Sequence, residues 1–296
     1  MTPRQTSGPG LRWMFHSTAM VPDYDLACQR LGLLCGLSVL EYSESTNPAI
    51  GRRGGMTWVG DNAIEIGEPI IEGGVERFVR KLGGGVHSVA CQVHEVDQAV
   101  EHFAEIGVRV AARPRPELCF TDPRDTGGIV FQWSAIEHKD DPRFGAAVAP
   151  SPFRPLIEVT EQAFVGAIVD DPFRWAPFYA SLLGTDVTFE RPDAALDEPA
   201  AGVSLGDCTL ALYAPPMERS QELYGTRHER SRTHLIGLTV SDYAASLEHL
   251  DGAGFAVEYR SENAAFLNTS STGSIQLALV SGLLPNDPRA RLLSEG

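Results

Sequence analysis

Three side chains that could do chemistry lie in short, largely apolar stretches of this chain. His16 lies in FHSTAMV, Glu65 in AIEIGEP and Gln132 in IVFQW. Imidazole, carboxylate and amide groups can transfer protons, donate hydrogen bonds or bind a divalent ion. Each also has a simpler interpretation, as a hydrogen-bonded structural histidine, a carboxylate on the solvent side of a half-buried strand and an ordinary strand glutamine. The elements that carry these residues decide between the interpretations.

Two further segments contain residue types that are common in binding sites. His87 follows the triplet Gly83-Gly84-Gly85, which precedes a predicted strand and is therefore no dinucleotide fingerprint, since that motif opens a helix. Asp122 and Asp125 in TDPRDTGG could coordinate a cation. Asp, Pro and Gly are also the residues that a turn requires, and the turn is the favoured interpretation.

The positioning elements recur along the chain. A predicted strand, an Asp placed to cap the next helix, a helix with apolar residues at a 3.6-residue period and a closing Gly occur four times. The four units are marked by Val21, Asp23 and Gly36; Val93, Asp97 and Gly107; Val169, Asp171 and Gly184; and Val240, Asp242 and Gly254. About three short strands follow each predicted helix. Val21 and Val169 are 148 residues apart, and Val93 and Val240 are 147 apart, so a half-chain has been duplicated.

The composition narrows the function classes. The 296 residues include 24 Lys and Arg against 39 Asp and Glu, a net charge of −15 that disfavours nucleic acid and anionic membrane surfaces as partners. No apolar run approaches the roughly 18 residues of a membrane helix. The five cysteines form no CxxC pair, which is typical of reduced thiols. We expect a soluble cytoplasmic protein with a small-molecule substrate, and a homodimer stays open.

The repeated β-α-β-β-β unit resembles the vicinal oxygen chelate superfamily, which includes glyoxalase I, methylmalonyl-CoA epimerase, extradiol dioxygenases and bleomycin-resistance proteins. The resemblance runs from about residue 11 to about residue 282. It rests on MFHSTAMVPDYDLA, AIEIGEPI, GGGVHSVACQVHEVDQAVEHFAEIGV and CFTDPRDTGGIVFQW in the first half, and on FVGAIVDDPFRWAPFYASLLG and THLIGLTVSDYAASLEHLDGAG in the second. The first half is most similar to methylmalonyl-CoA epimerase, through the GGGVH and FTDPRDTGG segments.

The resemblance implies an α+β fold of four βαβββ modules. They would form two tandem domains, residues 11–136 and 159–282, joined by a linker over residues 137–158. Each domain would be a cupped, mostly antiparallel sheet with its helices outside.

The resemblance also implies a divalent metal ion (Zn, Co, Ni, Mn or Fe), held by the first and fourth strands of both units in a cup. The family positions match His16, Glu65 and Gln132. The fourth position is Ser88, and the neighbouring His87 would face the cup only through a bulge or a local twist. Glu65 is expected as a ligand or as the catalytic proton-transfer base, and Gln132 as a ligand or a donor to the substrate.

Two departures separate this chain from the epimerase. The epimerase's glutamate on the third strand corresponds to Thr57. The second half carries Phe164, Ala211, Leu235 and Ala278 at the four ligand positions, and none of these side chains can bind a metal. The predicted site therefore belongs to the first half.

The leading hypothesis is a glyoxalase-like, metal-dependent isomerase or lyase that stabilises an enolate-like intermediate. The first alternative is an extradiol-type Fe(II) dioxygenase, which needs two histidines and one carboxylate and so requires His87 to face inward. The second alternative is a protein that binds a small molecule without chemistry, as in bleomycin resistance.

Overall fold

The computed structural model describes residues 8–47, 50–146, 151–193, 198–214, 232–250 and 252–289. The first half contains β1 (Leu11–Met20), α1 (Tyr24–Cys35), β2 (Leu40–Ser45), β3 (Arg52–Val59), β4 (Asn62–Pro69), α2 (Gly74–Leu82), β5 (Gly85–Val93), α3 (Val96–Glu105), β6 (Val110–Arg115), β7 (Leu118–Thr121), β8 (Val130–Ser134) and the 3-10 turn η1 (Pro142–Phe144). The second half contains β9 (Val159–Ile168), α4 (Pro172–Leu183), β10 (Val187–Asp193), β11 (Glu198–Ser204), β12 (Thr209–Tyr213), β13 (Arg232–Val240), α6 (Tyr243–Leu250), β14 (Val257–Arg260), β15 (Ala264–Leu267) and β16 (Leu277–Val280).

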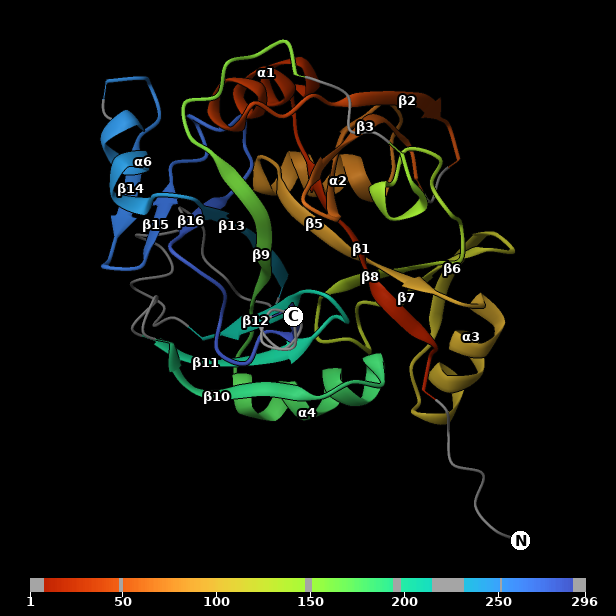
Figure 1. Cartoon of the computed structure of the whole chain (residues 1–296). Coiled ribbons are helices and arrows are strands. Elements are labelled where there is room, and N and C mark those ends of the chain that lie inside the picture. Colours follow the sequence, from red (N-terminus) through yellow and green to blue (C-terminus); the bar gives the residue numbers. More distant parts are fainter. Residues whose placement is uncertain are drawn as a thin grey trace, which may run out of the picture.

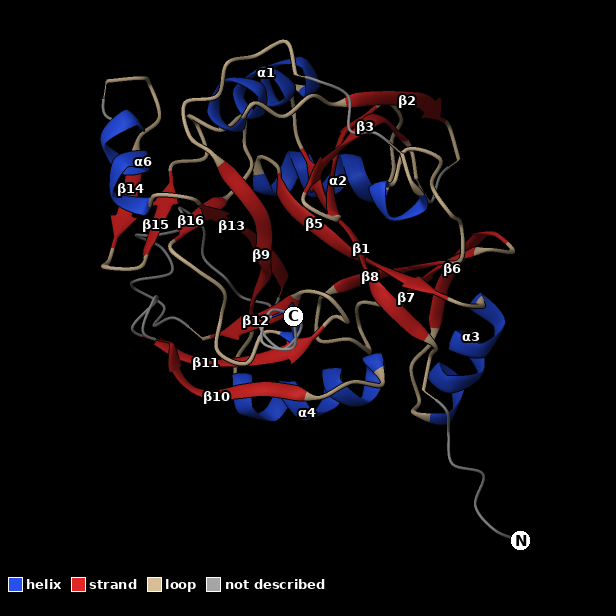
Figure 2. Ribbon diagram, in the orientation of Figure 1, coloured by secondary structure: helices blue, strands red, loops and turns tan. Residues whose placement is uncertain are grey.

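Each half closes its own eight-stranded sheet, with the orders β2-β3-β4-β1-β5-β8-β7-β6 and β10-β11-β12-β9-β13-β16-β15-β14. The two orders are the same when the second half is counted from β9. Most neighbouring strands are antiparallel, and β1 with β4 and β5 with β8 are the parallel pairs of the first sheet. The four-module α+β prediction is confirmed, and Figures 1 and 2 show α1, α3, α4 and α6 around the two sheets.

The helix starts follow the predicted capping residues in three of the four units. Asp23 accepts a hydrogen bond from the Leu26 amide, Asp171 caps α4 in the same way, and Asp242 accepts from the Ala245 amide. In the second unit the prediction was wrong, because Asp97 lies inside α3. Glu95 is the N-cap there, and its longer side chain makes no capping hydrogen bond.

Helix α2 was not predicted from the sequence. It joins the two modules of the first half and buries Val75 and Val79, which pack with Met20 of β1. Gly83 ends the helix with a φ of 76°, in the left-handed region that glycine adopts without strain. The GGG triplet therefore stops a helix and turns the chain into β5.

The two sheets pack through their helix-bearing faces. One core combines β5, β8 and α3 of the first half with β9, β12 and α4 of the second. The other combines α1 and β4 of the first half with β13, β16 and α6 of the second. The concave faces of the two sheets therefore point away from this shared interior.

Contacts between equivalent residues mark the pseudo-twofold relation of the halves. Met14 and Gln162 are 148 positions apart, and the Gln162 amide lies 3.9 Å from the Met14 sulfur. Val86 and Thr233 are 147 apart, and the Thr233 hydroxyl donates to the Val86 carbonyl at 3.3 Å. Residues at equivalent positions of the two halves therefore contact each other, as expected for a duplicated half-chain.

A repeated Asp-Pro-Arg motif closes each half. Asp141 and Arg143 form a buried ion pair at 2.9 Å, and Arg143 also donates to the Met14 carbonyl at 3.4 Å. Asp287 and Arg289 form the equivalent pair, and Arg289 donates to the Gln162 and Ala163 carbonyls at 2.8 and 2.7 Å. The first motif lies in the predicted linker, and the second lies beyond the predicted end of the second domain. Residues 147–150 of the linker fall outside the described part of the chain.

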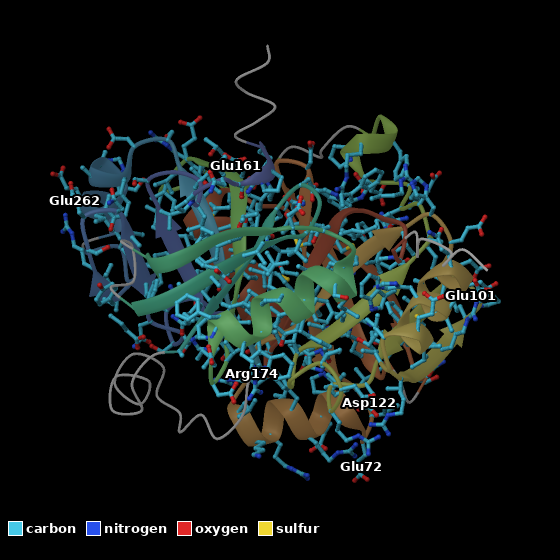
Figure 3. The ribbon with its side chains drawn as sticks, turned by 90° about the horizontal axis from the view of Figure 1, so that it is seen from below. Glu72, Glu101, Asp122, Glu161, Arg174 and Glu262 are labelled. Carbon is cyan, nitrogen blue, oxygen red and sulfur yellow. The ribbon has the colours of Figure 1, made fainter. Side chains whose placement is uncertain are left out.

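None of the helices in the described part of the chain is both long enough and apolar enough to cross a membrane. All five cysteines are unpaired, and Cys35, Cys91, Cys119 and Cys208 are buried. The acidic side chains labelled in Figure 3, such as Glu72, Glu101 and Glu262, lie at the outside of the molecule.

We expect Arg289→Met to lower the free energy of unfolding by about 3 kcal/mol, because it leaves the fully buried Asp287 carboxylate without its cation. Urea denaturation would measure the change. Arg174→Met, which removes an exposed arginine of α4, is the matched control and should change stability by less than about 0.5 kcal/mol. Equal losses in the two variants would contradict the bracing role of the motif.

Candidate functional site

The strand register brings the predicted site residues onto one concave face. Thr18 of β1 lies opposite Glu65 of β4 and opposite Ser88 of β5. His16 lies two residues before Thr18, and its partner on β5, Ala90, pairs in turn with Gln132 of β8. Because side chains alternate along a strand, His16, Glu65, Ser88 and Gln132 share the face turned away from the shared cores.

His87 reaches the same face through a bulge. The pairing of β1 with β5 shifts between Thr18, which lies opposite Ser88, and Ala19, which lies opposite Val86, so His87 is the extra residue. Both His87 and Ser88 line the cavity. The His87 ring packs edge-on against Phe78 of α2, with 4.9 Å between ring centres. Its Nδ1 atom is buried and has no hydrogen-bond partner among the described residues.

These side chains surround a cavity of about 100 Å³. Its polar lining comes from five strands of the first sheet: His16, Thr18, Arg52, Glu65, His87, Ser88 and Gln132. Its apolar lining is Met20, Ile50, Met56, Val75, Leu118 and Phe120. Polar groups that converge on a space walled by apolar side chains are a feature of ligand sites, and this space is small compared with most of them.

Arg52 is the cation of this cavity. It opens β3, and its guanidinium forms an ion pair with the Glu65 carboxylate. Glu65 also accepts a hydrogen bond from the Thr18 hydroxyl at 3.1 Å. Burial raises the pKa of Glu65, but the charge of Arg52, followed by His16 and Thr18, outweighs it and holds that pKa below its ordinary value. Glu65 is therefore ionised at neutral pH.

His16 is neutral. Burial lowers its pKa to about 4, Glu65 opposes the shift, and Arg52 and His138 add to it. Its Nδ1 lies 3.1 Å from the Thr18 hydroxyl and 3.8 Å from a Glu65 oxygen, and its Nε2 lies 3.2 Å from the Gln132 amide nitrogen. Burial, reinforced by Arg52, likewise lowers the pKa of His87 to about 4. The cavity thus holds one ion pair and two uncharged imidazoles.

The predicted metal ligands do not converge on one point. Glu65 faces Nδ1 of His16 and Gln132 faces Nε2, so an ion on either nitrogen would have one of the two as a neighbour and not both. The charge of Arg52 already occupies the Glu65 carboxylate. Among the described residues, no group of three His, Cys, Asp or Glu side chains could hold a metal ion. The arrangement does not fit the divalent ion that the resemblance implies.

An aromatic cluster fills the far end of the same concave face. The His138 ring lies among Phe15, Tyr42 and Trp58, at centroid distances of 6.2, 4.8 and 5.6 Å. His138 belongs to the predicted linker, so this segment covers the end of the first cup. The Tyr42 hydroxyl and the Trp58 indole nitrogen are buried without hydrogen-bond partners among the described residues.

The third strand brings no acid into the cavity. Met56 lies opposite Glu65 and lines the cavity, whereas Thr57 lies opposite Ile64 on the other face. Neither Met56 nor Thr57 is acidic, so β3 has no counterpart of the epimerase's glutamate at either position. Arg52, four residues before Met56 on the same face, is the charged residue that β3 supplies instead.

The concave face of the second sheet is filled. Phe164, Ala211, Leu235 and Ala278 belong to one buried apolar cluster, which Tyr213 and Phe266 complete. The Phe164 ring packs directly on Gly237, where a Cβ atom would come within 2.3 Å of it. These residues form a core where the first half has its cavity.

The remaining polar candidates belong to a turn. Asp122 accepts hydrogen bonds from Arg124, and Asp125 pairs with Arg109 at 2.7 Å. The hydrogen bonds from Arg124 hold the pKa of Asp122 at about 2. The structure favours the turn interpretation of this segment.

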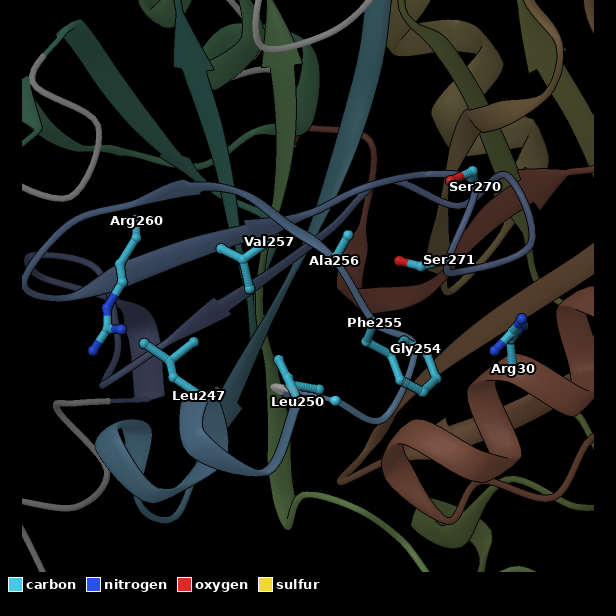
Figure 4. A pocket seen from close by; sticks show the side chains of 11 residues that line it. Arg30, Leu247, Leu250, Gly254, Phe255, Ala256, Val257, Arg260, Ser270 and Ser271 are labelled. Atoms are coloured by element: carbon cyan, nitrogen blue, oxygen red, sulfur yellow. The ribbon is translucent and has the colours of Figure 1, made fainter.

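A larger groove of about 820 Å³ lies on the second half, between α6 and the loop at residues 252–257 (Figure 4). Arg30 and Arg260 lie at its two ends, and Leu247, Leu250 and Phe255 lie between them. It is open to solvent and contains none of the predicted site residues.

The sequence reasoning missed Arg52 and His138. A signal for Arg52 was present, since GRRGGMTWV alternates so that Arg52 and Met56 share a face. No comparable signal marks His138, because a covering contact made by a linker leaves no periodic pattern.

The comparisons with known proteins agree with this architecture. Residues 162–266 match the family model of the glyoxalase/bleomycin resistance protein/dioxygenase superfamily. A mutant of 4-hydroxymandelate synthase from Streptomyces coelicolor has a similar fold over the whole chain, with a TM-score of 0.67, 16% sequence identity and coverage of 97% of this chain and 98% of that one. Methylmalonyl-CoA epimerase from Mycobacterium tuberculosis is similar over 44% of this chain and 91% of its own, with a TM-score of 0.39 and 23% identity. No curated protein sequence matches this chain.

Residues 162–266 are therefore similar in sequence to that superfamily, and the likeness to 4-hydroxymandelate synthase extends over the fold of the whole chain. The match covers the second half in sequence, and the repeated strand order extends the same fold to the first half.

The two buried histidines predict acid sensitivity. An ordinary histidine has a pKa near 6.5, so between about pH 6.5 and pH 4 the unfolded chain binds a proton at His16 that the folded chain does not. Stability should therefore fall as the pH falls through this window. At pH 5 we expect His16 to account for a loss of about 2 kcal/mol relative to pH 7.

Urea denaturation at pH 7 and pH 5 would test this, with His16→Gln as the variant and the exposed His94→Gln as its control. The pH-dependent loss should be smaller in His16→Gln by about that amount and unchanged in His94→Gln. The comparison isolates His16 from other buried titratable groups. Identical pH dependence in His16→Gln and the parent protein would contradict a neutral His16.

Proposed function

We propose that the first domain is the catalytic domain of an isomerase or lyase that moves a proton on a small oxygen-bearing molecule. The composition of the cavity supports this proposal. An ionised Arg52–Glu65 pair and two neutral histidines line one small space. Neutral imidazole accepts protons, and a fixed guanidinium stabilises negative charge that develops on oxygen.

The residues divide these roles by their contacts. The Nδ1 atom of His87 has no partner among the described residues, so it is the candidate base that takes a proton from the substrate carbon. The electron pair left behind moves to the adjacent oxygen, where Arg52 stabilises the enolate-like charge. Glu65 holds Arg52 in place, and because its carboxylate is already paired with that guanidinium and with Thr18, it is the weaker candidate for the base.

His16 and Gln132 support this arrangement. Gln132 contacts His16 across the cavity and can turn its amide toward a substrate oxygen. His16 links Gln132 to Thr18, which in turn donates to Glu65. No step is assigned to a metal ion, since the ligand set does not fit one.

The two alternative functions, a dioxygenase and a non-catalytic binding protein, differ in the support that they receive. A dioxygenase needs His16, His87 and Glu65 around one iron, and no such triad is formed by the described residues. A non-catalytic binding protein is the second candidate, favoured by the filled second cup and by the absence of an acid on β3. In either case we propose a small molecule as the partner and the cytoplasm as the location, supported by the unpaired thiols.

Proton exchange provides the test of catalysis. We expect the protein to exchange the carbon-bound hydrogen of some members of a panel of short 2-oxo and 2-methyl carboxylic acids in D₂O, followed by proton NMR. His87→Asn should slow the exchange at least about 100-fold, because a general base contributes that much. His94→Asn, in which an exposed histidine is replaced, should exchange at the parent rate. Binding of panel members without any exchange would favour the non-catalytic alternative.

A further inference from the structure

We propose that Arg52 is the resident cation of the first cup and receives the carboxylate of a small monoanionic ligand. This inference rests on the proposed function for the identity of the site, and it adds the class of substrate. Nothing in the superfamily resemblance assigns a role to this residue.

The first step is the unused hydrogen-bonding capacity of Arg52. Its Nη2 atom contacts Glu65, whereas its Nε atom is buried and has no partner among the described residues. A guanidinium presents five N–H donors in a fixed fork, and one carboxylate satisfies one side of it. A buried donor without an acceptor is costly, so a ligand oxygen that accepts from Nε would be bound favourably.

The second step is the position of His87. Its Nδ1 is likewise buried and without a partner among the described residues, and it lines the same cavity as Arg52. A ligand whose carboxylate lies on Arg52 would share this small cavity with the candidate base.

The third step limits the charge and size of the ligand. Glu65 already balances the charge of Arg52, so a second negative charge on the ligand would be repelled. The cavity of about 100 Å³ is small, and Ile50, Val75 and Phe120 line it with apolar surface. A short monocarboxylate with an uncharged body meets these conditions.

The matched residue Arg53 provides a control. It follows Arg52 on β3, points to the other face and pairs with Glu68 at 3.0 Å and with Asp25 at 3.1 Å. It does not line the cavity. The two arginines differ in side-chain direction and partners but share the same strand.

Isothermal titration of the full chain, treated with EDTA, would test the proposal with propionate, butyrate and 2-methylpropanoate as probes. Butyramide, which has the shape of butyrate without its charge, is the control ligand. We expect saturable binding of at least one carboxylate, and binding of butyramide at least about tenfold weaker. Arg52→Met should weaken carboxylate binding at least about tenfold, and Arg53→Met should leave it unchanged.

The double variant Arg52→Met/Glu65→Met guards against misfolding, because it removes both charges of the pair. It should keep the parent's thermal transition and still fail to bind the carboxylate. The proposal is overturned if no probe binds the parent protein, if butyramide binds as tightly as butyrate, or if Arg52→Met binds carboxylates as the parent does.

The outcomes separate this inference from the proposed function. Carboxylate binding that depends on Arg52, without proton exchange, would support the ligand class and remove the enzymatic role. Proton exchange on a neutral substrate that depends on His87, without binding of any carboxylate, would support the enzymatic role and remove the ligand class.

Discussion

The ion pair between Arg52 and Glu65 determines the character of the first cup. A carboxylate on a concave strand face, buried under apolar side chains, needs a compensating cation, and the removal of one partner from such a pair typically costs about 3–5 kcal/mol. Here β3 supplies the cation. The charge of Arg52 holds the pKa of Glu65 low and adds to the burial that lowers the pKa of His16 and of His87, whereas Glu65 opposes both histidine shifts. The same contact occupies the Glu65 carboxylate, which is then less available as a metal ligand.

The two halves share one fold, but the concave face of the first has a cavity and that of the second is filled. Both halves use the same strand order, the same type of helix start and the same Asp-Pro-Arg brace. In the second half Phe164 fills the space over Gly237, and an apolar cluster closes the concave face. In the first half the equivalent positions are His16 and Ala90, and a cavity remains. The second half contributes its helix-bearing face to both shared cores, which stabilises the half that keeps the polar site.

The sequence predicted the elements well because their signals are local. Repeated spacing, capping Asp residues and closing glycines predicted the four modules, and the family resemblance implied that His16, Glu65 and Gln132 share one site. The same reasoning could not resolve His87, since a bulge depends on the pairing of β1 with β5, which is a tertiary feature. It also missed Arg52, whose place on the face of Met56 follows from strand alternation, whereas its pairing with Glu65 is a tertiary contact. The resemblance implied that Glu65 and Gln132 bind one ion together with His16. In the structure they lie at opposite nitrogens of the His16 ring.

We infer that a guanidinium, and not a divalent ion, supplies the positive charge of this site. Titration of the EDTA-treated protein with Co²⁺, followed by visible absorption and calorimetry, tests it most directly, with Glu65→Gln measured in parallel. The account predicts no stoichiometric Co²⁺ binding that depends on Glu65, and no absorption bands of a nitrogen- and oxygen-bound ion. One tightly bound Co²⁺ per chain, lost in Glu65→Gln, would contradict it.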